Sequence, residues 1–168
     1  MTTLLDTSTF LRAARSLTLP QSAPTETNAR SRVAAPVSPA QAVQVAARAI
    51  SRSALHPVSS PAAGVAFHPR ALLAVLTYCY ASEIYCSTDI EDLMMRDATF
   101  RSLCGDEVPD AATLRRFRRH NREVIETCLG ETLRLLSGQA GDHAADGEIL
   151  EQAHQLITTA VLMDMHEN

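Results

Sequence analysis

The sequence predicts an all-α protein, a small irregular helical bundle with a helix-turn-helix-like unit and a disordered N-terminal arm. Two observations carry this prediction. Apolar residues after residue 66 recur at intervals of three and four, which is the period of an amphipathic helix. No stretch of useful length alternates between apolar and polar residues, as a half-buried strand would. With 168 residues, of which 46% are hydrophobic, the chain has material for one modest core.

Three parts follow one another along the chain. Residues 1–65 hold six of the eight prolines among many Ser, Thr and Ala residues. We expect a mostly disordered, mildly basic arm there, because large apolar groups are too few to offset the entropy of ordering. Its stretches 9–17 and 39–53 are expected to be helical only transiently. Residues 66–137 are predicted to form a helical domain, and residues 138–168 an acidic loop and an amphipathic helix.

Two helices are expected to open the domain. The first begins at Pro69, because proline suits the first turn of a helix, and it runs to about Ile84. The second begins at Asp89, because Thr88 followed three residues later by Glu91 matches a capping box. Both predictions rest on local signals alone.

The helix-turn-helix-like unit is expected next. Phe100 and Leu103 predict a short helix that Gly105 ends in a left-handed conformation. Asp110 is the expected N-cap of the following helix. Whether this helix runs unbroken past Gly130 stays open, because glycine weakens a helix interior. At about 100° per residue, apolar residues fall in one arc of this helix and arginines in the opposite arc. The arginines are Arg115, Arg118, Arg119 and Arg122, with Arg116 at the border of the arc.

Charge is distributed unevenly along the chain. The net charge is −4, yet residues 111–122 hold five arginines and no acid. A local positive field decides whether a polyanion docks, whatever the total charge of the protein. A rigid helix with such a face can follow a phosphate backbone or enter a major groove, where arginine reads guanine. The alternative is an ordinary solvated helix face, balanced by acidic helices on either side.

Other kinds of site are not indicated. The four cysteines form no C-x-x-C pair and the six histidines show no ligand spacing, so we expect reduced thiols, no metal and no cofactor. Tyr78, Tyr80 and Tyr85 are expected in the core or at its edge. There is no export signal, and the longest uncharged apolar stretch is too short to cross a membrane. A cytoplasmic protein without membrane contact is expected.

The C-terminal helix is predicted from Glu148 to about Asp164, with an apolar face for the core or for a second copy. Acids after Gly138 include Asp142 and Asp146, besides the two just named. A two-metal site needs carboxylates that are held together on one scaffold, and this region reads as loop and helix. We therefore expect capping or solvated acids there, and no catalytic residue.

The region from His68 to His120 has a specific motif, the block Pro109-Asp110-x-x-Thr113-Leu114-x-Arg116-Phe117-Arg118-Arg119-His120. It is preceded by His68-Pro69-Arg70, Tyr78, Tyr80, Ile84, Ser87, Glu91, Phe100, Leu103 and Gly105. With these residues the region resembles the InsH-type N-terminal domain of insertion-sequence transposases. The resemblance implies binding to the ends of a mobile element in DNA transposition, with catalysis in a separate domain that holds metal ions on three acidic residues. It also implies that Arg115, Arg116, Arg118, Arg119 and Arg122 face DNA.

The functional hypothesis is therefore the DNA-binding domain of a truncated transposase, which is not an enzyme by itself. DNA is the expected partner. Two alternatives stay open. One is a protein-interaction module that binds a second copy, or binds and inhibits a full-length transposase. The other is a remnant without function.

Overall fold

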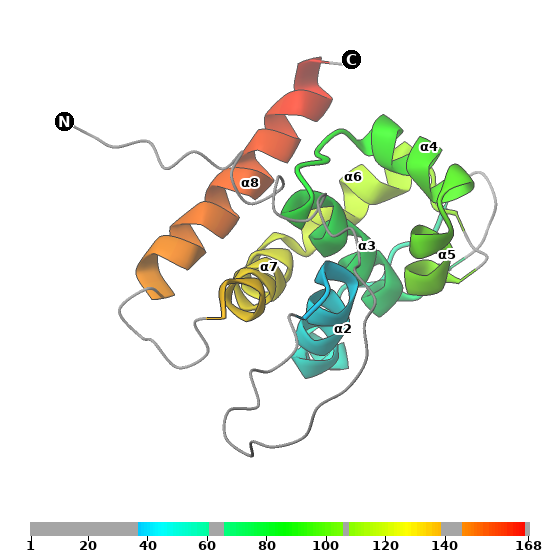
Figure 1. Cartoon of the computed structure of the whole chain (residues 1–168). Helices are drawn as coiled ribbons and strands as arrows, with labels where there is room; N and C mark the ends of the chain where they lie inside the picture. The colour runs from blue at the N-terminus through cyan, green and yellow to red at the C-terminus, as the bar shows by residue number, and fades with distance from the viewer. Residues whose placement is uncertain (1–36, 61–65, 106–107, 139–145, 167–168) are drawn as a thin grey trace, which may run out of the picture. The chain divides into compact units, whose positions relative to one another are not determined.

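The computed structural model describes residues 37–60, 66–105, 108–138 and 146–166. Within these ranges the chain is helical, as predicted, and β pairing is limited to one bridge between Ser59 and Ala66. Figure 1 shows the helices α2 (Pro39–Ala49), α3 (Pro69–Ala81), α4 (Ser87–Arg96), α5 (Ala98–Cys104), α6 (Ala111–His120), α7 (Arg122–Ser137) and α8 (Asp146–His166). A 3-10 turn, η1, covers Arg52–Ala54. The expected helical stretch 9–17 and the loop residues Gly141 and Asp142 lie outside the described residues.

Helix α2 differs most from the expectation of a transiently helical arm. Its start is fixed by a capping box, in which Ser38 and Gln41 each accept a hydrogen bond from the other's backbone N–H. Proline at position 39 suits the first turn. The inner face packs against α3 and α7, as Figure 1 shows. That face is fully buried and consists of Ala42, Val43, Ala46 and Ala47. Small side chains there let the neighbouring helices come close, so this helix belongs to the core.

Helix α3 begins at Pro69, as expected, but ends at Ala81 rather than near Ile84. The backbone of Glu83 is left-handed, with φ of 61°. Its N–H donates to the carbonyl of Tyr80, and the N–H of Ile84 donates to the carbonyl of Cys79. These two bonds form a Schellman motif, which usually has glycine at the left-handed position. The sequence shows no such glycine here, so the helix end was not visible in it.

Helix α4 begins at Ser87, two residues before the predicted Asp89, and the expected capping box does not form. A carboxylate of α8 caps α4 instead, because Asp164 accepts from both the backbone N–H and the hydroxyl of Ser87, at 2.9 and 2.7 Å. Contrary to the predicted capping box, Glu91 therefore does not cap α4. Its carboxylate instead accepts from the backbone N–H of Ala111 at 2.8 Å and so links α4 to the first turn of α6.

The segment from α5 to α7 follows the local signals more closely. Gly105 ends α5 with φ of 76°, and Asp110 caps α6 by accepting from the N–H of Thr113 at 2.6 Å, both as predicted. The expected single helix is, however, divided at Asn121. Its side-chain amide donates to the carbonyl of Phe117, four residues earlier. Such a side-chain bond competes with the helical backbone pattern, and the chain turns there.

Helix α7 runs through Gly130 without a break, which the sequence left open, and ends at Gly138, whose φ is 70°. It lies between α2 and α8 in Figure 1 and packs against both. A Cβ at position 130 would meet Ile149 and Leu150 at 4.0 Å, which is ordinary van der Waals contact, so α8 packs alongside α7 here and a small side chain would also fit. Helix α8 starts at Asp146, slightly earlier than expected, and buries four apolar residues against this neighbour: Ile149, Ala153, Ile157 and Ala160.

The core gathers side chains from all of these helices. Tyr80 is fully buried while Tyr78 and Tyr85 are half-buried, as expected. The thiols of Cys79, Cys86 and Cys128 are buried and not in disulfides. Burial raises the pKa of Cys128 to about 11. Of the helices in the described ranges, none has the length and hydropathy that a membrane span requires.

Candidate nucleic-acid interface

The solvent side of α6 carries three arginines and a histidine, and we call Arg115, Arg116, Arg119 and His120 the outer face of α6. Arg119 and His120 are exposed, whereas Arg115 and Arg116 are partly exposed. The small Ala112 lies among them and is exposed too. No acidic residue occurs within the helix. At about 100° per residue these side chains share one side of a helix whose other side is packed into the core.

Two carboxylates lie at the N-terminal end of α6, that of Asp110 and that of Glu91, which accepts from the N–H of Ala111. Asp110 accepts hydrogen bonds from Thr113 and from the hydroxyl of Ser60, the latter at 2.9 Å. Burial opposes its ionisation, but these bonds and the charge of Arg116 outweigh that effect and hold the pKa of Asp110 below its usual value. The carboxylate of Asp110 is thus occupied by the cap, and the rest of the face keeps its positive charge.

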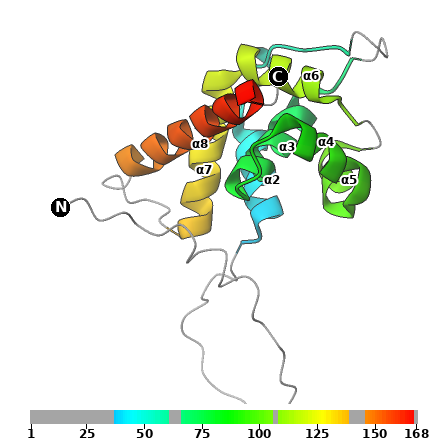
Figure 2. The same cartoon turned by 90° about the horizontal axis from the view of Figure 1, so that it is seen from above.

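An extended segment lies beside α6 and is joined to it by side-chain bonds. We call residues 52–60 the strap. Asn121 accepts from the backbone N–H of His56 at 2.7 Å and donates to the carbonyl of the same residue at 3.0 Å. Arg116 donates to the carbonyl of Ser59 at 3.2 Å. The bonds run in opposite order along the two segments, so the strap is antiparallel to α6, as Figure 2 shows.

Arg118 lies on the inner side of α6, so the predicted arc is wrong for this residue. Its side chain is 5% exposed and forms an ion pair with Asp164 of α8. It also donates to the phenol oxygen of Tyr80 at 3.0 Å. Burial disfavours the charge, but Tyr80 and Asp164 outweigh it and raise the pKa of Arg118. Position 118 follows Leu114 by four residues and so lies about 40° from it on the helix, which is why the core reaches it.

Arg122, the last residue of the predicted set, belongs to α7 rather than to α6. It is partly exposed and donates to the hydroxyl of Thr158 on α8 at 3.0 Å. Helix α8 therefore holds two of the five predicted arginines. The three that α8 does not hold are Arg115, Arg116 and Arg119, which are exposed or partly exposed.

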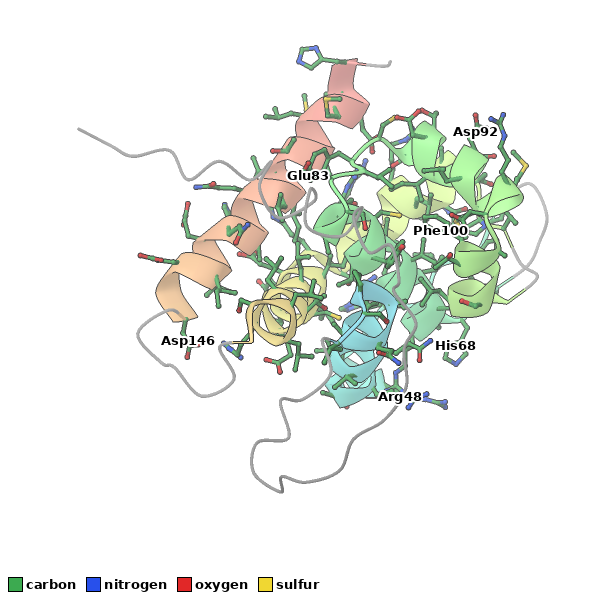
Figure 3. All side chains as sticks on the ribbon, in the orientation of Figure 1. Arg48, His68, Glu83, Asp92, Phe100 and Asp146 are labelled. Atoms are coloured by element: carbon green, nitrogen blue, oxygen red, sulfur yellow. The ribbon has the colours of Figure 1, made fainter. Side chains whose placement is uncertain are left out.

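The acids of the C-terminal region do not gather in one place. Asp146 pairs with Arg134 at 2.8 Å, Glu148 is exposed, and Asp164 is buried against Arg118. Figure 3 shows Asp92 on α4 and Asp146 at the start of α8, on separate elements. Within the described ranges, no group of three or more His, Cys, Asp or Glu side chains has the arrangement of a metal site. The carboxylate that pairs with Arg118 is that of Asp164, whereas Glu83 is exposed after the end of α3.

A family model for a transposase domain, DUF772, matches residues 37–120, which is half of the chain. This chain belongs to that transposase family. The matched range begins just before α2 and ends with α6, so the transposase domain includes the capped alanine-rich helix that the resemblance to residues 68–120 did not reach. Helices α7 and α8 follow the matched range. No curated protein and no solved structure matches the chain.

Two features of this transposase domain were missed by reasoning from the sequence. The first is the α2 cap, although Ser38-Pro39-Ala40-Gln41 carries a complete capping-box signal. The second is the strap, whose attachment to Asn121 joins residues 65 positions apart. The sequence contains no local signal for the second feature.

Proposed function

We propose that this transposase domain binds DNA in transposition, and that the outer face of α6 contacts the sugar-phosphate backbone. One observation carries the proposal. Arg115, Arg116, Arg119 and His120 share the solvent side of a helix that has no acid of its own. Membership of a transposase family supports a role at DNA.

The guanidinium groups on the outer face of α6 are suited to binding a phosphate backbone. Guanidinium groups make strong charge-assisted hydrogen bonds to phosphate oxygens, often through two N–H groups at once. The helix that carries them is held on its other side by the core, so little order has to be gained on binding. Each phosphate neutralised releases condensed counterions and makes affinity fall with salt.

The remaining two arginines have a different role in this proposal. Arg118 and Arg122 position the helix rather than meet phosphate, because α8 already holds their guanidinium groups through Asp164 and Thr158. We propose that they fix how far α6 stands out from the core. The contact set is therefore smaller than the five residues that the sequence suggested.

The test is fluorescence-polarisation binding of the full chain to a labelled duplex of random sequence, over a series of salt concentrations. The test variant changes Arg115, Arg116 and Arg119 to glutamine, which removes charge from exposed positions. We expect the slope of log affinity against log salt to become shallower by about 2.7, because three phosphate contacts are lost.

The matched control is Arg96→Gln, since Arg96 is an exposed arginine of α4 whose partner is the exposed Asp92. It should bind like the parent protein. If the folded parent shows no salt-dependent binding, or if the triple variant binds as tightly as the control, the outer face of α6 is only solvated surface.

The finer features of the family resemblance are part of the same proposal. We infer that the preferred site is the end of an insertion sequence, that α5 and α6 act as a helix-turn-helix unit, and that this domain itself carries no catalytic step. Duplexes made from the ends of a related element should then bind more tightly than scrambled duplexes at the same salt concentration. Equal affinity for both would leave only sequence-tolerant binding.

A second candidate function is association with an intact transposase or with a second copy. The observation that favours it is a set of large apolar side chains exposed on α8: Leu150, and near its C-terminal end Leu162, Met163 and Met165. Neighbouring exposed apolar groups, such as the last three, are typical of interaction sites. Co-purification with intact transposase after nuclease treatment would support this function, and its failure beside retained DNA binding would exclude it.

A further inference from the structure

The strap has the composition of a phosphate-binding segment. Between Glu26 and Glu83 the sequence contains no acidic residue, so neither the strap nor α2 carries a negative side chain. Arg52 and His56 are exposed, and so are the hydroxyl-bearing Ser53 and Ser59. Cations, hydroxyls and backbone N–H groups together supply most of the phosphate contacts that proteins make to DNA.

The strap is also held in a defined position. Leu55 and Val58 are buried and anchor it in the core, while the residues between and beside them stay exposed. Hydrogen bonds join His56 to Asn121 at one end of α6 and Ser60 to Asp110 at the other. A segment fixed at both ends of a helix moves with that helix, so contacts from the two elements reach one ligand together.

Arg116 connects the two elements. Its guanidinium donates to the carbonyl of Ser59, which draws this side chain of the outer face toward the strap. His56 lies against Asn121, the residue directly after His120. Arg52 is in η1, whose closing bond from the N–H of Leu55 to the carbonyl of Arg52 comes directly before His56. Arg52 and His56 of the strap thus adjoin the outer face of α6, and the capping carboxylate of Asp110 lies between Ser60 and Arg116.

We infer that the strap is the second half of the DNA-binding surface, with Arg52 and His56 as contact residues beside the outer face of α6. This inference rests on the proposed function and assigns contacts that neither the arginine motif nor the family match singles out. The strap meets phosphates that flank those held by α6, and it thereby sets the register of the domain on the duplex.

The test uses the full chain and the same random duplex, with Arg52→Gln and His56→Gln made separately and together. Both side chains are exposed, so the variants should keep the free energy of unfolding of the parent. We expect Arg52→Gln to weaken binding by about fivefold at 0.1 M salt and to make the salt slope shallower by about 0.9, as the loss of one phosphate contact requires. His56→Gln should weaken binding further in the double variant.

The matched control is Arg48→Gln, because Arg48 is an exposed arginine of α2 that lies outside the strap. If Arg48→Gln weakens binding as much as Arg52→Gln, the effect is one of total charge and the inference is wrong. It is equally wrong if the parent binds and both strap variants bind like the parent. A parent that does not bind at all overturns the proposed function instead, so the two failures are distinguishable.

Discussion

Arg118 and Arg119 are adjacent in the chain, yet they lie in opposite environments. Arg119 is exposed on the outer face of α6, whereas Arg118 is buried on the inner side between Asp164 and Tyr80. One helix therefore carries an arginine that is open to a partner and one whose charge is already neutralised within the fold. The comparison teaches that an arginine-rich motif is not a uniform binding surface, because the neighbouring helices decide which guanidinium groups remain available.

The largest effect on the free energy of unfolding is expected from a substitution on the inner side of α6. Asp164→Ala leaves the buried guanidinium of Arg118 without its carboxylate and removes the cap of α4 at Ser87. We expect the free energy of unfolding to fall by about 3 to 5 kcal/mol, because an uncompensated buried charge is strongly destabilising. Chemical denaturation followed by circular dichroism measures this. A loss below about 1 kcal/mol would mean that the pair behaves like an exposed one, and the contrast with Arg119 would disappear.

A smaller effect on stability is expected from Tyr80, the neutral partner of Arg118 on the inner side of α6. Tyr80→Phe removes the phenol oxygen that accepts from Arg118 at 3.0 Å, so we expect a loss of about 1 to 2 kcal/mol. Burial raises the pKa of Tyr80 above its usual value of 10.0, although Arg118 partly opposes this. The stability that this phenol contributes is complete below pH 10.0 and is lost as the pH rises from there.

Denaturation at increasing alkaline pH tests the direction of this pH dependence of stability. The parent protein should lose stability more steeply above the usual tyrosine pKa than Tyr80→Phe does. Equal slopes in the two proteins would show that the inner side of α6 does not hold this phenol in its protonated form.

The cap of α6 gives the next effect in size. Asp110→Ala should cost about 1 kcal/mol, the typical value for loss of an N-cap. Hydrogen bonds from Thr113 and Ser60 and the charge of Arg116 outweigh burial and lower the pKa of Asp110 below 3.8. The stabilisation is therefore present above that pH and is lost as the pH falls below it.

A matched variant separates the charge of Asp110 from its capping bond. Asp110→Asn keeps a side-chain oxygen for the cap but cannot titrate, so its stability should fall less steeply with acid than that of the parent. Thermal unfolding across the acid range measures the difference. Identical acid profiles of the two proteins would mean that the ionised form of Asp110 does not stabilise the fold.

The smallest effect on stability is expected on the outer face. Arg119→Gln should change the free energy of unfolding by less than about 0.5 kcal/mol, as exposed substitutions commonly do. Its effect belongs to binding, where the salt slope should become shallower by about 0.9. If Arg119→Gln instead destabilises the fold and leaves DNA binding unchanged, Arg119 has a structural role and the contrast between the inner and outer sides of α6 is wrong.

Much of the fold follows from local signals in the sequence. The left-handed glycine after α5 and the N-cap of α6 at Asp110 could both be predicted, because each depends on residues close in the chain. The capping box of α2 was available in the same way. Periodicity also predicted that Arg115 and Arg119 lie opposite the apolar arc of α6, but it placed Arg118 there as well, and that residue is buried.

The tertiary structure decided the rest, because the deciding partners come from distant parts of the chain. Helix α4 begins at Ser87 since a carboxylate 77 residues away caps it. Arg118 is neutralised because α8 brings Asp164 to the edge of the apolar arc. The strap reaches α6 through Asn121. The helical period fixes where side chains lie around the helix axis. Only packing determines which of them contact a partner and which remain exposed to solvent.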